Sequence, residues 1–224
     1  MNFKLFTNIK TIYFLKGGTV VSIDEEIMQK SDALNNLILT KWLKQEFLTF
    51  EWFFTLFVVL VCYLLFFYLV DKKRIVEILL YGSLVAVAYV VYDSIGMFFG
   101  FWAVKIAISP VYPNFFGSSL TVAPLIAMIL YQYKSPWNSF LRWSILFAGL
   151  FVFGYYGFLL SNMGIFVYLK PYAKIIDFCS FLFVIIVPRG IMILLLKKEA
   201  QNGNISAENS LSKLIYKQIQ RNNN

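Results

Sequence analysis

The chain has 224 residues, of which 59% are hydrophobic, 19% aromatic and only 14% charged, whereas about 25% of the residues in a soluble domain are charged. Its net charge is +8. Because Lys and Arg gather at the ends of apolar stretches and in the tails, we interpret this charge as anchoring to membrane lipids and expect no nucleic-acid partner. Histidine is absent, the two cysteines lack metal-type spacing, and no nucleotide-binding or hydrolase motif occurs. We therefore expect no cofactor, no metal and no catalytic residue.

Residues 1–47 form an N-terminal segment outside the membrane. Two short β-prone runs around Gly17-Gly18 are typical of a hairpin, and the order of features that marks a signal peptide is missing. From about Ser31 apolar residues recur at helical spacing, which predicts an amphipathic helix along the membrane surface. Met28 precedes this helix; if translation starts there, residues 1–27 are an artefact of the assigned start site.

Long apolar stretches follow, and the first of them runs without a charge from Trp52 to Val70. A transmembrane helix needs about 20 mostly apolar residues to cross roughly 30 Å of hydrocarbon. The sequence therefore predicts an all-α fold, an integral membrane helical bundle occupying residues 48–197. We expect about five transmembrane helices, near residues 50–70, 76–94, 116–133, 142–162 and 174–196.

The last segment, residues 198–224, is expected to be a polar cytoplasmic tail. Within it, residues 211–221 would place apolar side chains on one helical face and basic ones on the other. This stretch is either a helix on the inner leaflet or a disordered end.

Lysine and arginine residues near the span ends indicate the orientation of the protein. One side would hold Lys72, Lys73, Arg74, Lys134, Arg142, Lys197 and Lys198, and the other Lys41, Lys44, Lys105, Lys170 and Lys174. By the positive-inside rule the first side is cytoplasmic. We expect a multi-pass protein of the bacterial plasma membrane with its N-terminus outside and its C-terminus inside.

Residues 95–115 are too apolar for an ordinary loop, and Pro110 and Pro113 interrupt them. Such an aromatic stretch is typical of an interfacial or re-entrant segment on the outer side. It is either a plain aromatic belt or the lid of a pocket.

Charged residues within or beside the spans are the candidates for a polar site, because burying a charge in a membrane is costly. Asp93, Asp177 and Lys105 are expected near the outer surface, where they form either a small polar pocket or simply hydrated and locally paired groups. Glu77 and Arg189 are expected near the inner side. Arg189 would hold Glu77 or a lipid phosphate, or would extend its guanidinium to the inner surface.

Small residues predict helix packing. In the fourth predicted span, Gly154, Gly157, Ser161 and Gly164 recur along one helical side and would form a smooth glycine strip. Gly96 and Gly100 form a GxxxG pattern beyond the second predicted span, where Gly82 and Ala86 also share a face. We interpret these residues as sites of close helix contact, either within one chain or between subunits.

Several stretches of the sequence share a pattern with known sequences: Trp42-Leu43, Phe47–Phe53, Leu69–Gly82, Asp93–Gly96, Leu120–Pro124, Tyr131–Tyr133, Trp137 and Phe140-Leu141. In these stretches the chain resembles an uncharacterised family of small multi-pass membrane proteins from spore-forming Gram-positive bacteria. The resemblance covers about residues 28–196. It implies the architecture and a start near Met28, but no activity.

The chain departs from that family at two places. Ser119 stands where members tend to carry an acidic residue, and Tyr156-Gly157 stands where they tend to carry Glu-Pro. Both departures weaken the case for proton or ion chemistry at an intramembrane carboxylate cluster.

Three functions follow from the sequence. The first is a non-enzymatic membrane protein that acts through helix, lipid or partner contacts, with a homo-oligomer or another membrane protein as the expected partner. The second is a small transporter or ligand-binding membrane protein that uses the polar site at the outer face. A membrane-embedded enzyme comes third.

Overall fold

The computed structural model describes residues 14–16, 19–111, 117–134 and 136–201. The chain divides into two units, Met1–Gln45 and Glu46–Asn224. The amphipathic helix predicted for residues 211–221 lies outside the described residues.

The first unit contains a hairpin and a helix. Strands β1 (Phe14–Lys16) and β2 (Thr19–Val21) pair antiparallel, as the sequence predicted. Helix α1 (Ile23–Lys41) begins earlier than the predicted Ser31. The reason is a capping box, in which Ser22 Oγ accepts a hydrogen bond from the Glu25 amide at 3.1 Å and the Glu25 carboxylate accepts one from the Ser22 amide at 3.2 Å. A short π-helix, η1 (Trp42–Glu46), continues from α1.

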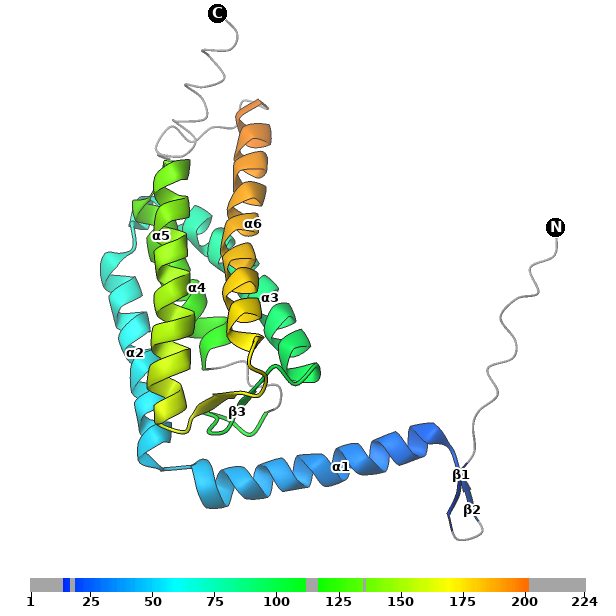
Figure 1. The fold of residues 1–224 in the computed structure, drawn as a ribbon. Helices are drawn as coiled ribbons and strands as arrows, with labels where there is room; N and C mark the ends of the chain where they lie inside the picture. Colours follow the sequence, from blue (N-terminus) through cyan, green and yellow to red (C-terminus); the bar gives the residue numbers. More distant parts are fainter. Residues whose placement is uncertain (1–13, 17–18, 112–116, 135, 202–224) are drawn as a thin grey trace, which may run out of the picture. The chain divides into compact units, whose positions relative to one another are not determined.

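The second unit is a helical bundle (Figure 1). Its helical segments are α2 (Phe50–Leu69), η2 (Lys72–Arg74), α3 (Ile75–Phe98), η3 (Ser118–Val122), α4 (Ala123–Tyr133), α5 (Trp137–Gly149), η4 (Leu150–Leu160) and α6 (Ala173–Gln201). Four continuous stretches are long and apolar enough to cross a membrane: Phe50–Leu69, Lys72–Phe98, Trp137–Leu160 and Ala173–Lys198. They agree with four of the five predicted spans.

The third predicted span, residues 116–133, was wrong as a full crossing. Among the described residues this region holds a shorter apolar helix, Ser119–Tyr133. At 1.5 Å per residue, a helix of fewer than 18 residues covers less than about 27 Å, which is short of the roughly 30 Å of hydrocarbon.

The short helix nevertheless runs along the length of α3. At its start, Ser119 Oγ donates a hydrogen bond to Asp93 near the end of α3, and at its end Gln132 Nε2 donates one to the Leu69 carbonyl before α3 begins. Residues of α4 are buried between α2, α3 and α5. The helix is therefore enclosed by protein for most of its length.

Residues 95–115 were predicted to be interfacial or re-entrant, which stays a prediction, and their described part contains a short strand. Helix α3 continues to Phe98, Gly100 turns the chain with φ +63°, and β3 (Trp102–Val104) pairs antiparallel with β4 (Phe166–Tyr168). A positive φ costs glycine little, which explains Gly100 at this turn. We call this end of the bundle the ribbon end, and the opposite end, at the α2–α3 connection, the turn end.

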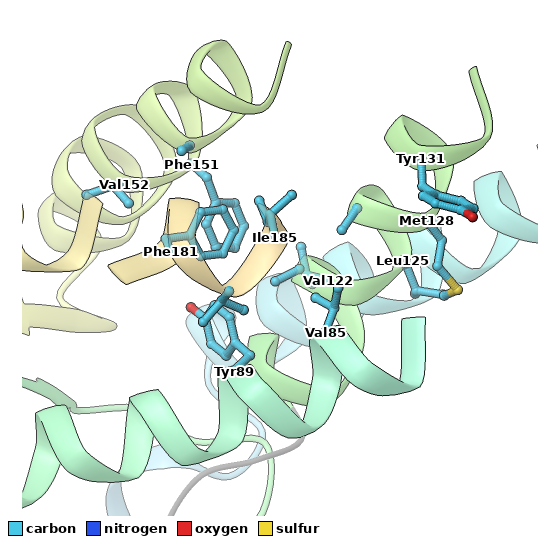
Figure 2. Packing of buried hydrophobic residues seen from close by; sticks show 14 of the residues in the cluster. Val85, Tyr89, Val122, Leu125, Met128, Tyr131, Phe151, Val152, Phe181 and Ile185 are labelled. Carbon is cyan, nitrogen blue, oxygen red and sulfur yellow. The ribbon is translucent and has the colours of Figure 1, made fainter. Parts of the chain in front are cut away.

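The bundle is apolar both inside and outside. Its interior holds close-packed side chains such as Val85, Phe181 and Ile185 (Figure 2). Outward-facing residues are equally apolar; Leu64 and Phe183 are 70% and 67% exposed. Soluble proteins rarely expose apolar surface on this scale, whereas lipid tails solvate it without penalty. The fold thus indicates a multi-pass membrane protein.

Candidate functional site

The carboxylate of Asp177 is the most enclosed acidic group at the ribbon end. It lies near the start of α6, is 4% exposed, and accepts hydrogen bonds from the hydroxyls of Tyr92 on α3 and Tyr168 on β4. Burial, and then the negative charge of Asp177, raise the pKa of Tyr168. The phenol therefore stays protonated and available as a donor. Helix α3, which is distant in the sequence, thus meets strand β4 and helix α6 at this carboxylate.

Asp93 lies one residue after Tyr92 and is held by a different pair of donors. The indole Nε1 of Trp102 donates to Oδ1 at 2.9 Å, and Ser119 Oγ donates to Oδ2 at 2.9 Å. The Trp102 ring also lies 5.2 Å from the Tyr92 ring. Asp93 and Asp177 thus belong to one connected group. We call Asp93, Asp177, Tyr92, Trp102, Ser119 and Tyr168 the Asp93–Asp177 cluster.

Gly96 positions Trp102. A Cβ atom placed on Gly96 would lie 1.9 Å from Cζ2 of the Trp102 ring, far inside van der Waals contact. The indole therefore lies directly on the α3 backbone, where its N–H can reach Asp93 one turn earlier. Gly96 was predicted to contact another helix, and its role is instead to admit this ring.

Two further tyrosines border the cluster. The Tyr89 and Tyr156 hydroxyls lie 3.4 Å apart, and the Tyr89 ring contacts Tyr92 and Phe181 at 5.4 and 5.5 Å. Beyond Tyr89 toward the turn end lie Val85 and Ile185, which form part of an apolar layer (Figure 2). The polar groups of the ribbon end are thereby separated from those of the turn end.

Lys105, predicted to share this site, lies elsewhere on the ribbon. Its amide donates to the Ile165 carbonyl at 2.7 Å, and its side chain is exposed whereas the two carboxylates are enclosed. The lysine next to the cluster is Lys174, whose Nζ lies 5.7 Å from the Tyr168 ring centroid. Exposed residues of the β-ribbon point away from the helical core. The sequence prediction placed Lys105 only by its distance from the span ends, and could not show this direction.

Glu77 and Arg189 both lie at the turn end, and the carboxylate of Glu77 pairs with Arg74. The Arg74 and Glu77 side chains are both 5% exposed, their N–O distance is 2.8 Å, and Tyr131 donates a further bond to Glu77 at 2.7 Å. The predicted pair of Arg189 and Glu77 is therefore replaced by the pair of Arg74 and Glu77, which are three residues apart. An i,i+3 spacing brings such side chains together on a helix.

Arg189 does not extend to the surface. It is 1% exposed, donates to the Lys134 carbonyl at 2.9 Å, and places its guanidinium 4.0 Å from the Phe140 ring centroid. The carbonyl groups at the end of a helix carry partial negative charge, and an aromatic face attracts a cation. These two interactions offset the cost of burying the charge.

Tyr81 and Tyr131 connect the turn-end groups. Their rings stack with centroids 4.3 Å apart, and Tyr81 donates to the Ile185 carbonyl at 3.1 Å. That carbonyl precedes Pro188, and a proline inside a helix disturbs the hydrogen bonds of the preceding turn. Sequence reasoning missed both tyrosines, although Glu77, Tyr81, Tyr89 and Asp93 recur at multiples of four on one face of α3.

The predicted glycine strip does not form a continuous packing surface. Gly154 and Gly164 meet nothing within 4 Å, Gly164 turns the chain with φ +71°, and Ser161 Oγ bonds to the Tyr156 carbonyl. Of these residues, only Gly157 has another helix nearby, since an added Cβ would lie 3.7 Å from Lys174 Cε. The prediction assumed 3.6 residues per turn, whereas η4 is a π-helix with wider turns.

The other two predicted glycine contacts, at Gly100 and Gly82, have opposite outcomes. Gly100 lies in the turn after α3 and meets nothing within 4 Å. Gly82 does make a close helix contact, since an added Cβ would lie 2.2 Å from the sulfur of Met128 on α4. At Gly82 the small residue therefore allows α3 and α4 to pack closely inside the bundle.

The arrangement can bind, orient and exchange protons, because carboxylates and phenols are its main reactive groups. Within the part of the chain that the structure describes, no group of three or more His, Cys, Asp or Glu side chains could hold a metal ion. Comparison with protein-family models, with curated proteins and with solved structures gives no match for this chain.

Proposed function

We propose that the protein is a small proton-linked transporter or ligand-binding protein of the plasma membrane, and that the Asp93–Asp177 cluster is its functional centre. The observation that carries this proposal is the enclosure of Asp177, 4% exposed among phenol donors from two other elements. Carboxylates at such positions in membrane proteins commonly mark ion pathways and proton relays. The sequence left open that Asp177 is hydrated or salt-bridged, and its burial and tyrosine donors favour the polar site.

The cluster offers two carboxylates whose charges depend on each other. Tyr92 donates to Asp177 and is adjacent in sequence to Asp93, so a proton gained at one carboxylate changes the field at the other. The apolar layer at Val85 and Ile185 limits exchange to the ribbon end. A protonated and a deprotonated cluster would then differ in the hydrogen bonds that join α3 to α6.

The charge distribution supports the orientation proposed from the sequence. At the turn end lie Lys72, Lys73, Arg74, Lys134, Arg142, Arg189, Lys197 and Lys198, whereas the described ribbon end has Lys105, Lys170 and Lys174. We infer that the turn end faces the cytoplasm. Because Trp52 at the start of α2 bonds to Ile108 of the ribbon end, the N-terminal end of α2 would be outside.

A function through helix or partner contacts is the second candidate. The observation in its favour is Gly154, which is exposed on the long Trp137–Leu160 helix and has open space above its Cα. A neighbouring helix could approach closely there. The resemblance to a family of small multi-pass membrane proteins fits both candidates. The third interpretation, an enzyme, gains no support from the groups at either end.

Infrared spectroscopy of the protein in lipid vesicles tests the proposal directly. A proton-exchanging carboxylate gives a carbonyl band that rises and falls with pH, and Asp177→Asn and Asp93→Asn should each remove part of that band. Asp32→Asn, which alters an exposed carboxylate of α1, is the matched control and should leave the buried-carboxyl component unchanged. If neither cluster variant changes the buried component, the proposal is wrong.

A further inference from the structure

Helix α1 presents its large apolar side chains to its surroundings. None of its residues is buried, and Leu34 and Leu37 are 55% and 70% exposed. In a water-facing helix such exposure is unfavourable, because each large apolar side chain forfeits the gain of leaving water. An apolar environment would therefore stabilise the helix, and the described residues of the first unit do not provide one.

Most of the large apolar residues of α1 share one face, whereas Met28 and Leu39 lie on the other side. Ile23, Ile27, Leu34 and Ile38 are separated by four, seven and four residues, which at 100° per residue keeps them within one stripe. Leu37 lies beside this stripe. The opposite face carries the polar residues Glu25, Asp32 and Asn36. We call the first set the α1 stripe.

Lysines accompany the stripe. Lys30 and Lys41 lie along it at the same helical angle, and Lys30 pairs with Glu26 at 2.8 Å. A lysine can lay its aliphatic stem on an apolar surface while its ammonium group stays at headgroup level. Lysines beside an apolar stripe, with acidic residues opposite, are typical of helices that lie in a membrane interface.

Chain connectivity fixes which surface is available. Lys41 ends α1 and Phe50 begins α2, so only residues 42–49 separate the helix from a segment long and apolar enough to cross the bilayer. Eight residues reach at most about 28 Å when extended. Tethering at this range makes binding to that bilayer an intramolecular event with a high effective concentration.

We propose that α1 binds the surface of the bilayer that α2 enters, with the α1 stripe at the boundary between headgroups and acyl chains. The charges of residues 22–45 nearly balance, with Lys30, Lys41 and Lys44 against Asp24, Glu25, Glu26 and Asp32. Apolar contact therefore drives the binding, and neither added salt nor anionic lipid is needed for it. This inference does not depend on the function proposed for the Asp93–Asp177 cluster.

A fluorescent label placed on each face of α1 tests the proposal. The parent for labelling is the full chain with Cys62→Ala and Cys179→Ala, reconstituted in phosphatidylcholine vesicles and checked for monodispersity. We expect an environment-sensitive dye at Leu34→Cys to emit at shorter wavelength and to be quenched by lipid carrying a nitroxide. The same dye at Asn36→Cys, on the opposite face, should emit as in water and resist that quencher.

Three outcomes would overturn the proposal. The two labels would behave alike if α1 stood free in water. The Leu34→Cys label would be shielded but insensitive to nitroxide lipid, and would transfer energy to a labelled second copy, if a protein partner covered the stripe. Shielding that vanished in high salt would mean that charge attraction drives the binding.

A second measurement uses the unmodified chain and avoids any effect of the cysteine substitutions. A phospholipid with a photoreactive group near its headgroup should crosslink to peptides of α1, and mass spectrometry should place the adducts at the stripe. Adducts confined to α2 and the other long helices would contradict the proposal.

Discussion

The hydroxyl of Tyr92 donates its hydrogen bond to Asp177 and leaves the adjacent Asp93 to other donors. Of two successive residues of α3, Tyr92 thus donates to one carboxylate of the cluster, and Asp93 is the other. This division ties α3 to α6 through Tyr92, and α3 to the β-ribbon and η3 through Asp93. A change of charge or side chain at either carboxylate would therefore alter the packing around the other.

Tyr92→Phe removes one donor from an enclosed carboxylate and keeps the ring. A buried acceptor that loses a partner costs about 1–3 kcal/mol, so we expect a lower free energy of unfolding in detergent. Tyr68→Phe, at a position 85% exposed on α2, is the control and should have almost no effect. The double variant Tyr92→Phe/Asp177→Asn should lose less free energy of unfolding than the two single variants lose together. If the losses were fully additive, the pair would not interact.

Gly96→Ala places a methyl group inside the Trp102 ring position. Because the indole must move away from α3, its hydrogen bond to Asp93 breaks, and overpacking of this kind costs about 1–3 kcal/mol. Lower thermal stability should accompany a change in tryptophan fluorescence. Gly154→Ala adds the same methyl where nothing lies within 4 Å, and should be neutral or slightly stabilising. Equal effects of the two variants would contradict the role given to Gly96.

Glu77→Gln leaves the buried guanidinium of Arg74 without its ion-pair partner. Breaking a buried pair on one side costs about 3–5 kcal/mol, so the variant should unfold at much lower denaturant concentration. Combining it with Arg74→Gln should recover part of the loss. Removal of the exposed pair by Glu26→Gln provides the comparison, and should cost about 0–1 kcal/mol. A small effect at Glu77 would contradict the buried pair.

Arg189→Lys keeps the charge but loses the planar guanidinium that lies on the Phe140 ring. Lysine is a compact, strongly hydrated cation and does not replace such stacking, so stability should fall by about 1–2 kcal/mol. The exposed Arg142, changed in the same way, is the matched control. Equal melting temperatures for both variants would argue against the buried role of Arg189.

The raised pKa of Tyr168 predicts a dependence of stability on high pH. Below about pH 10, the ordinary phenol pKa, the residue is protonated in both states and favours neither. Above that pH the unfolded chain ionises while the folded phenol retains its proton, so stability falls. Tyr168→Phe should lose less stability than the parent between pH 9 and 11 in equilibrium unfolding. An identical decline in both would refute this assignment.

Hydropathy was sufficient to predict the four long helices, because lipid as a solvent selects nearly continuous apolar stretches. It overextended the region of α4 because a short helix enclosed by protein is as apolar as a full span. The capping box at Ser22 and Glu25 would have given the start of α1 correctly. Helical periodicity failed at Gly154 and Gly164, where a π-helix and a turn replace the assumed α-helix.

The sequence predicted the charged residues of the candidate site but not the neutral residues that donate hydrogen bonds to them. Asp93 and Asp177 are conspicuous because charged residues are rare in apolar stretches. Tyr92 and Tyr168 are not, since the chain has 14 tyrosines and most of them resemble ordinary interfacial aromatics. Arg74 could have been identified as the partner of Glu77 from its i,i+3 spacing, whereas the contact of Arg189 with a helix-end carbonyl depends on tertiary structure.

The shortness of the Ser119–Tyr133 helix bears on how the chain is made. A segment that cannot reach across hydrocarbon leaves unsatisfied peptide groups at membrane depth unless other protein surrounds it. During biosynthesis its enclosure by α2 and α3 would be completed only when the later helix α5 has arrived. A nascent polypeptide that stops near residue 136 would lack α5 and therefore part of the protein that surrounds this segment.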